Sequence, residues 1–99
     1  MHKGGYTYIM ANTRPTLYTG VTSDLVKCVY QHKNHLADGF TSKYNLHKLV
    51  YFESYETIKE AIIREKQIKD MNRKDKIALI SNNNPKFDDL YNMILDKPE

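Results

Sequence analysis

Two kinds of side chain in this 99-residue sequence raise the question of chemistry before any fold is considered. Tyr8 and Tyr18 lie ten positions apart, each in a short stretch rich in β-branched and aromatic residues. Phenol hydroxyls can position water, contact phosphate or, when their pKa is depressed, accept a proton. The commoner outcome for aromatic residues on strands is packing beneath a helix with the hydroxyl reaching solvent. The sequence leaves both interpretations open.

Glu65 poses a sharper question, because it falls inside an apolar pattern. On a helix that advances about 100° per residue, Ile58, Ala61, Ile62 and Ile68 form an apolar stripe, and Glu65 lies near its middle. Burying an ionised carboxylate without a partner costs roughly several kcal/mol. Three alternatives are open. A basic residue pairs with Glu65, or the helix is rotated so that Glu65 is half exposed. Otherwise Glu65 is a metal ligand, and a hard divalent cation compensates its buried charge.

The elements that must position these side chains follow from the periodicity of the sequence. Residues 6–11 and 17–22 have the composition of strands and are separated by turn-forming residues, which predicts a hairpin. Strand alternation places Tyr8 and Tyr18 on one face together with Gly20. A glycine there would let a ligand or another backbone approach closely.

The rest of the chain predicts one more strand and four helices. Asp24 suits a helix N-terminus, and Thr57 with Glu60 matches a capping box. Asn84 is a candidate cap for a last helix that begins with Pro85. We expect a single domain over residues 1–99 with a core of about 5–82, a helix from about 24, a strand over 48–53, helices over about 57–71 and 73–80, and a C-terminal helix over about 85–95. This order, ββαβααα, predicts a small three-stranded sheet flanked by helices.

Composition restricts the class of protein further. The net charge of +3 and the pI of about 8.9 are mildly basic and compatible with phosphate contacts. The longest apolar run, residues 49–52, is too short to span a membrane, and residues 1–5 do not resemble an apolar signal region. The single Cys28 excludes an internal disulfide and a cysteine-based zinc site. We expect a soluble cytoplasmic protein of unknown oligomeric state.

Several motifs in order resemble one nuclease superfamily. Residues 6–8 (Tyr-Thr-Tyr) and 18–20 (Tyr-Thr-Gly) resemble the two halves of the GIY-YIG signature. Further stretches look like the small stand-alone bacterial branch of that superfamily, namely residues 24–25, His32, and residues 40–44, 49–53 and 64–69. The same fold forms the N-terminal domain of the incision subunit of nucleotide-excision repair. The resemblance covers about residues 5–82. It implies an α/β fold of the α+β type, with a three-stranded antiparallel sheet between helices.

The resemblance also implies an activity and a site. The family hydrolyses phosphodiester bonds of DNA in one metal-assisted step, and its substrates are chosen by structure, such as branched or damaged DNA, more than by sequence. Tyr8 and Tyr18 would lie beside the scissile phosphate, where one of them helps to deprotonate the attacking water. Glu65 matches the acid that binds Mg²⁺ or Mn²⁺. His32 matches a histidine of the family, although a hydrogen-bonded packing residue is equally compatible.

One position departs from the family pattern. Cys28 stands where the family has an arginine, and it supplies neither positive charge nor a planar fork for phosphate oxygens. Lys27, Lys43, Lys66 and Lys69 are candidate phosphate contacts, while the lysines of the long helix also fit an ordinary solvated face. Two functions therefore stay open: a metal-dependent endonuclease, in keeping with DNA repair, and a catalytically weak or inactive relative that binds nucleic acid.

The C-terminal stripe formed by Phe87, Leu90, Tyr91 and Ile94 allows a third role. Such a stripe either closes over the protein's own core or binds a partner protein. Residues 82–99 are acidic on balance, which argues against nucleic-acid contact there. We expect the stripe to cover the core.

Overall fold

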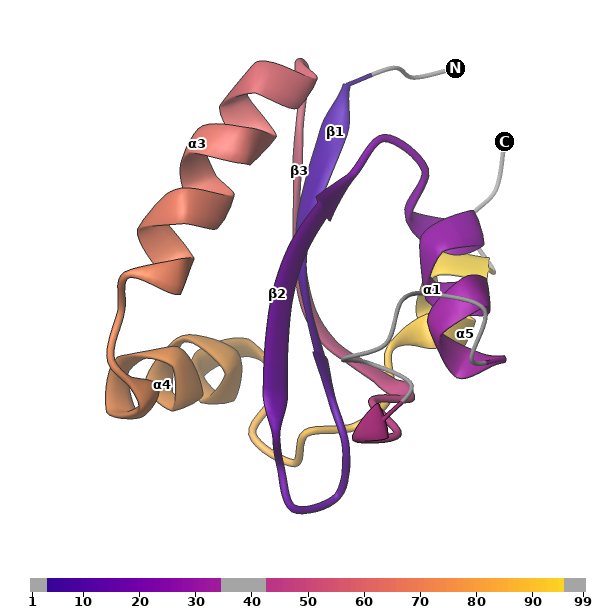
Figure 1. Ribbon diagram of the computed structural model, residues 1–99, viewed down its shortest axis with the longest axis vertical. Helices are drawn as coiled ribbons and strands as arrows, with labels where there is room; N and C mark the ends of the chain where they lie inside the picture. The colour runs from indigo at the N-terminus through magenta and orange to yellow at the C-terminus, as the bar shows by residue number, and fades with distance from the viewer. Residues whose placement is uncertain (1–3, 35–42, 96–99) are drawn as a thin grey trace.

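The computed structural model describes residues 4–34 and 43–95 and centres on a three-stranded antiparallel sheet (Figure 1). The strands are β1 (Gly5–Ala11), β2 (Leu17–Thr22) and β3 (Lys48–Tyr55), in the order β2-β1-β3. β1 pairs with both neighbours, and Tyr8 lies directly opposite Gly20 of β2. The predicted hairpin and the predicted order ββαβααα are confirmed.

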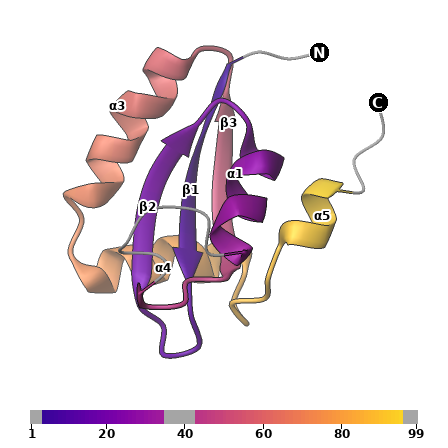
Figure 2. The same cartoon turned by 45° about the vertical axis from the view of Figure 1, so that its right-hand side comes forward.

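Helices cover both faces of this sheet. α1 (Leu25–Lys33) and α5 (Tyr91–Leu95) lie on one side, and α3 (Ile58–Lys69) lies on the other with α4 (Arg73–Asn83) following it (Figures 1 and 2). The predicted motif at 40–42 and the predicted stop near Gly39 lie outside the described residues. Within the described ranges, no helix has the length and apolar character that a membrane crossing requires.

The helix starts follow the capping chemistry in the sequence. The Asp24 carboxylate accepts the Lys27 backbone N–H at 3.2 Å. Thr57 and Glu60 form both bonds of the capping box that opens α3. These caps satisfy backbone donors that a helix N-terminus would otherwise leave without partners.

Strand alternation divides the buried side chains into two layers. The layer beneath α1 contains Tyr8, Met10, Leu25, Val29, Leu46 and Leu49, with Tyr18 and Cys28 packed against it. The layer beneath α3 and α4 contains Ile9, Ala11, Val50, Tyr51, Ile68 and Ile80. The predicted division of β1 and β2 into a tyrosine face and an aliphatic face is therefore confirmed.

A β-bulge interrupts the pairing of β1 with β3. Ile9 pairs with Tyr51 and the next residue, Met10, pairs with Leu49, so Val50 is the extra residue on β3. Both Val50 and Tyr51 contribute to the layer beneath α3 and α4. The period-2 pattern of the sequence did not predict this irregularity, because a bulge shifts the register by one residue.

The last helix begins later than the predicted start near residue 85. Asn84 caps the end of α4, and its side-chain amide donates to the carbonyls of Val50 at 3.0 Å and Asp88 at 2.8 Å. The chain then turns through Phe87 at φ 53°, which is incompatible with a helix. The Asp89 carboxylate accepts the Tyr91 N–H at 3.1 Å, so a side chain five residues after Asn84 starts α5.

The predicted apolar stripe of the C-terminal segment covers the protein's own core. Leu90, Tyr91 and Ile94 pack against the layer beneath α1, and Phe87 packs against the layer on the other face. An ion pair between Lys33 and Asp89 joins this segment to the end of α1. The C-terminal segment is therefore part of the fold.

Candidate active site

A hydrogen-bonded cluster of uncharged polar side chains lies between β1 and α1. The Tyr8 hydroxyl lies 3.1 Å from Nε2 of His32, and Tyr8 and His32 are only 3% and 5% exposed. Tyr8 comes from the central strand and His32 from the last turn of α1. The sheet and α1 thus hold a phenol and an imidazole in direct contact.

Tyr18 completes a triangle of rings. Its ring centroid lies 6.4 Å from that of Tyr8 and 5.8 Å from that of His32, and the Tyr8 and His32 rings are 5.7 Å apart. Gly20 allows this arrangement, because a Cβ at that position would lie 2.5 Å from the Tyr8 hydroxyl. The predicted close approach at Gly20 is therefore made by the Tyr8 ring of the same sheet.

Cys28 joins the cluster from α1, at the position where the resemblance places an arginine. Its thiol donates to the Tyr8 hydroxyl over 3.2 Å. Because the Tyr8 oxygen accepts this S–H, its own proton can point to Nε2 of His32 when that nitrogen is unprotonated. The Tyr8 hydroxyl thus has a thiol on one side and an imidazole nitrogen on the other. We call Tyr8, Tyr18, Cys28 and His32 the phenol cluster.

Glu65 lies on α3 and forms an ion pair within its own helix. Its side chain is 13% exposed, and a carboxylate oxygen lies 2.7 Å from Nζ of Lys69. The hydrogen bond to Glu65 raises the pKa of Lys69, burial opposes that shift, and the Tyr18 phenol adds to it electrostatically. Lys69 therefore links Glu65 on α3 to Tyr18 on the β2 edge of the sheet. Of the alternatives that the sequence left open for Glu65, the structure shows a basic partner.

The other predicted phosphate contacts are scattered. Lys27 and Lys66 are exposed on α1 and α3. Lys43 lies before β3, with its ammonium 5.5 Å from the ring centroid of Tyr44. The apolar stripe of α3 is also less buried than predicted, because Ile58 and Ile62 are exposed.

The residues present fit a magnesium-type ion only through Glu65. Among residues 4–34 and 43–95, no group of three His, Cys, Asp or Glu side chains could hold a metal. Mg²⁺ often takes only one or two protein carboxylates and keeps waters and substrate phosphates as its other ligands. The mostly buried Glu65 carboxylate is therefore compatible with such an ion, provided that Lys69 moves aside.

Sequence reasoning missed a second polar cluster, on the opposite face of the sheet. Arg64 clamps Glu53 with Nε 2.9 Å from Oε1 and Nη2 3.2 Å from Oε2. Tyr51 and Tyr55 also donate their hydroxyls to this carboxylate, the latter over 2.5 Å. Residues 51, 53 and 55 share a face because strand side chains alternate, which is the signal that would have revealed the set. We call Tyr51, Glu53, Tyr55 and Arg64 the ion-pair cluster.

The electrostatics of the ion-pair cluster are self-compensating. Burial opposes the change, but hydrogen bonds from Arg64, Tyr51 and Tyr55 hold the pKa of Glu53 below its ordinary value. Burial and the bond to Glu53 raise the pKa of Tyr51 to about 12. The carboxylate thus stays ionised while the phenol stays protonated, and Arg64 is committed to Glu53 and unavailable to replace an arginine at position 28.

The three-stranded antiparallel sheet and the helices on its two faces make this a small domain of the α+β type. A family model described as the GIY-YIG catalytic domain matches residues 4–78. The sequence is 41% identical over 76 residues to the UPF0213 protein CPE1444 of Clostridium perfringens, covering 77% of this chain and 82% of that protein. It is 37% identical over 76 residues to the UPF0213 protein SSP2268 of Staphylococcus saprophyticus, covering 77% and 93%.

A solved structure agrees on the fold. The solution structure of the UPF0213 protein BH0048 from Bacillus halodurans superimposes with a TM-score of 0.56 at 22% identity, over 95% of this chain and 98% of that one. This chain belongs to the GIY-YIG family of nuclease domains, in a branch of small stand-alone bacterial proteins.

Proposed function

We propose that this protein is a metal-dependent endonuclease that hydrolyses phosphodiester bonds of branched or damaged DNA. The observation that carries the proposal is the contact of the Tyr8 hydroxyl with Nε2 of His32, beside Tyr18, on residues that match the family's signature. A phenol that can give its proton to an imidazole is able to take one from water in turn.

In this proposal each side chain of the site has a distinct task. Tyr8 accepts the proton of the attacking water as its own proton moves to His32, and Tyr18 donates a hydrogen bond to the phosphate. Glu65 would hold Mg²⁺ or Mn²⁺, and Lys69, whose side chain is 53% exposed, would contact the phosphate in place of Glu65. The cation, when bound, lowers the pKa of water and stabilises charge on the phosphate oxygens.

A second candidate function rests on Cys28. Its thiol occupies one side of the Tyr8 hydroxyl and brings no positive charge to the site. An arginine that stabilises a phosphoryl-transfer transition state can contribute about 10³–10⁵ in rate. The alternative is therefore a relative that binds the same DNA and cuts it slowly or not at all.

Cleavage assays separate the two candidates. End-labelled branched, nicked, single-stranded and intact duplex DNA would be incubated with the protein and Mg²⁺ or Mn²⁺, and with a chelator as the blank. We expect cleavage of the branched or nicked substrates and a loss of about 100-fold in Glu65→Ala. Glu56→Ala, which removes an exposed acid just before α3, is the matched control and should keep the wild-type rate.

The outcomes point in different directions. Cleavage that persists in Glu65→Ala or in the chelator blank would reject the metal-dependent site. Tight binding of branched DNA with no cleavage under any of these conditions would favour the second candidate.

A further inference from the structure

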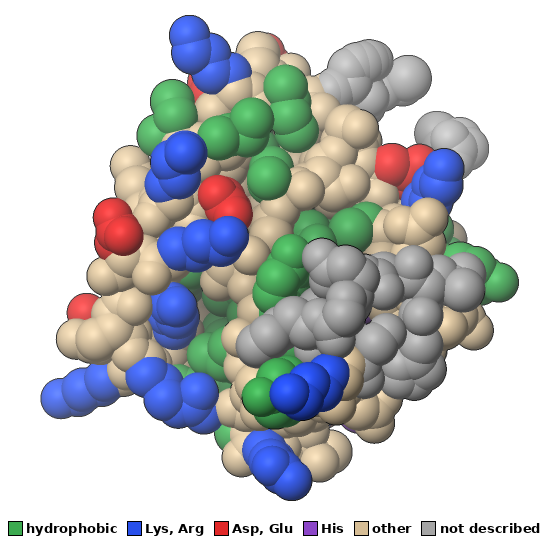
Figure 3. Space-filling model, viewed as in Figure 1, with side chains coloured by type: hydrophobic (Ala, Val, Ile, Leu, Met, Phe, Trp, Pro, Cys, Tyr) green, Lys and Arg blue, Asp and Glu red, His purple; other side chains and the backbone are tan. Residues whose placement is uncertain are grey.

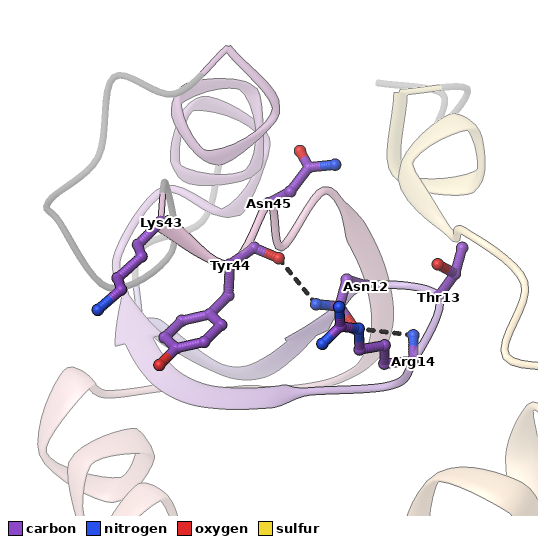
Figure 4. Close-up of a pocket in the computed structure, with 6 residues that line it drawn as sticks. All are labelled: Asn12, Thr13, Arg14, Lys43, Tyr44 and Asn45. Carbon is purple, nitrogen blue, oxygen red and sulfur yellow. Dashed lines mark hydrogen bonds between the residues drawn. The ribbon is translucent and has the colours of Figure 1, made fainter.

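A polar cavity of about 310 Å³ lies at the end of the β1–β2 hairpin, and neither cluster described above lines it. Its walls are the hairpin turn and the segment that precedes β3 (Figure 4). The lining residues are Asn12, Thr13, Arg14, Lys43, Tyr44 and Asn45. We call this cavity the hairpin pocket.

The buried side chain of Asn12 ties the two walls together. Its amide nitrogen donates to the Tyr44 carbonyl at 2.7 Å. Its amide oxygen accepts the backbone N–H groups of Arg14 at 2.9 Å and Thr16 at 2.7 Å. The pocket is therefore preorganised, because one 8%-exposed residue fixes both the turn and the facing segment.

The chemistry of the lining is that of an anion site with an aromatic surface. Arg14 and Lys43 bring two positive charges, and none of the lining residues within 4–34 and 43–95 is a carboxylate. The Tyr44 ring lies between these two side chains in Figure 4, and Tyr44 is 39% exposed. A nucleotide offers the complementary pair of groups, since its phosphate suits the cations and its base can stack on the ring.

Basic side chains connect the pocket to the phenol cluster. Arg73, at the start of α4, donates from Nη2 to the Pro15 carbonyl in the hairpin turn over 2.6 Å. Lys69, at the end of α3, is coupled electrostatically to Tyr18. Lys and Arg side chains gather over α3 and toward the hairpin end of the molecule (Figure 3). A polyanion could therefore follow the β2 edge from Tyr18 to the pocket.

We propose that the hairpin pocket binds one nucleotide of an unpaired nucleic-acid strand, with its base against the Tyr44 ring and the phosphates on either side of the nucleotide at Arg14 and Lys43. An unpaired strand fits because a base must leave its duplex stack to lie on an aromatic ring. The path of the strand past Tyr18 rests on the proposed function. Binding of the nucleotide in the hairpin pocket can be measured without cleavage. It identifies single-stranded regions as the feature of DNA structure that the protein selects.

The experiment measures binding of a fluorescent single strand and of an intact duplex by anisotropy, in chelator and over a series of salt concentrations. The variants are Arg14→Gln and Lys43→Gln, singly and together, with Tyr44→Leu and Tyr44→Phe. Lys86→Gln, at an exposed position outside both the pocket and α3, is the matched control for each single loss of charge. Loss of two phosphate contacts should lower the slope of log K against log salt by about 1.4 for a single strand. We expect about a tenfold loss of affinity in the double pocket variant at low salt and less than about a threefold loss in the control.

The aromatic contact has its own signature. Tyr44→Leu should weaken single-strand binding about tenfold and leave duplex binding unchanged, whereas Tyr44→Phe should retain the wild-type affinity. Equal losses in the pocket and control variants, equal effects of Tyr44→Leu on both DNAs, or no binding of the single strand by the wild type would overturn the proposal.

The binding experiment and the cleavage assay can fail separately. A wild type that binds the single strand through Arg14, Lys43 and Tyr44 but cuts nothing would uphold the pocket and reject the endonuclease. A wild type that cuts DNA while the pocket variants bind and cut as well as it does would reject the pocket alone. Thermal melting of each variant verifies folding, which should persist because Arg14, Lys43 and Tyr44 are exposed.

Discussion

The two faces of the sheet each carry a tyrosine-rich polar cluster, and the two clusters differ in charge. The phenol cluster beneath α1 consists of two phenols, an imidazole and a thiol, and the contacts described within it involve no acid or guanidinium. The ion-pair cluster beneath α3 surrounds one carboxylate with a bidentate guanidinium and two phenols. The same residue type therefore serves two different environments.

This difference separates a structural role from a chemical one. In the ion-pair cluster every charge has its counter-charge inside the protein, so the phenols of Tyr51 and Tyr55 are held in their protonated form. In the phenol cluster the Tyr8 hydroxyl contacts an imidazole nitrogen, and this is the contact through which we propose that a proton moves. A buried group that is fully compensated contributes to stability, whereas a proton relay is available for catalysis.

The largest expected effect comes from replacing one tyrosine of each cluster by phenylalanine. We expect Tyr8→Phe to lower the single-turnover cleavage rate at least about 100-fold, because it removes the group that accepts the proton of water. Tyr51→Phe should leave that rate within about twofold and lower the free energy of unfolding by about 1 kcal/mol, the net value of one hydrogen bond. Similar rate losses in both variants would erase the proposed division of roles.

The second effect concerns stability and compares two ion pairs of α3. Arg64→Met should cost about 2–3 kcal/mol in the free energy of unfolding, because it leaves the partly buried Glu53 without its cation. Lys69→Met should cost less, about 1 kcal/mol, because Glu65 loses one contact to a half-exposed ammonium whereas Glu53 loses both bonds of a guanidinium. Urea denaturation of both variants gives the comparison, and equal losses would show that the ion-pair cluster is no more structural than the Glu65 pair.

The smallest expected effect is on how the free energy of unfolding depends on pH. The lowered pKa of Glu53 contributes stability above the unfolded value of about 4.3, and this contribution is lost as pH falls through the folded pKa. The raised pKa of Tyr51 contributes stability below the unfolded value of about 10, and this is lost as pH rises through about 12. Carboxylate and phenol thus limit opposite ends of the range.

Ultraviolet absorbance of the phenolates tests the alkaline limit. Tyr51 should ionise near pH 12, about two units above an ordinary tyrosine. The late component of the titration should disappear in Tyr51→Phe and persist in Tyr8→Phe. A titration with no late component would show that the cluster does not hold this phenol in its protonated form.

The sequence predicted the fold well in the segments where the periodic spacing of apolar residues determines the secondary structure. Alternation along residues 6–11 and 17–22 was enough to place Tyr8 and Tyr18 on one face, because only β pairing with period 2 is compatible with that pattern. Helical spacing likewise identified Glu65 as a carboxylate that needed a partner, and Lys69 is that partner.

Features that depend on contacts between distant segments could not be predicted. Asn84 is a residue type that often starts a helix, but its side-chain amide donates to the carbonyl of Val50, the extra residue of the bulge. The Glu53 clamp needs Arg64 from α3, and helical periodicity does not reveal which strand residue a helix side chain will meet. A positive side chain that another element places beside the phenol cluster would be a contact of the same long-range kind, which the sequence does not predict.

The hydrogen bonds of the segment after α4 have a consequence for how copies of this protein behave when concentrated. β3 borders the sheet, and a bordering strand can recruit a foreign strand through its unused backbone groups. Here the Leu90 N–H donates to the Leu49 carbonyl at 2.7 Å, and the Asp89 carboxylate accepts the Leu49 N–H. The segment after α4 thereby occupies both backbone groups of Leu49, so a foreign strand cannot pair with β3 at that position.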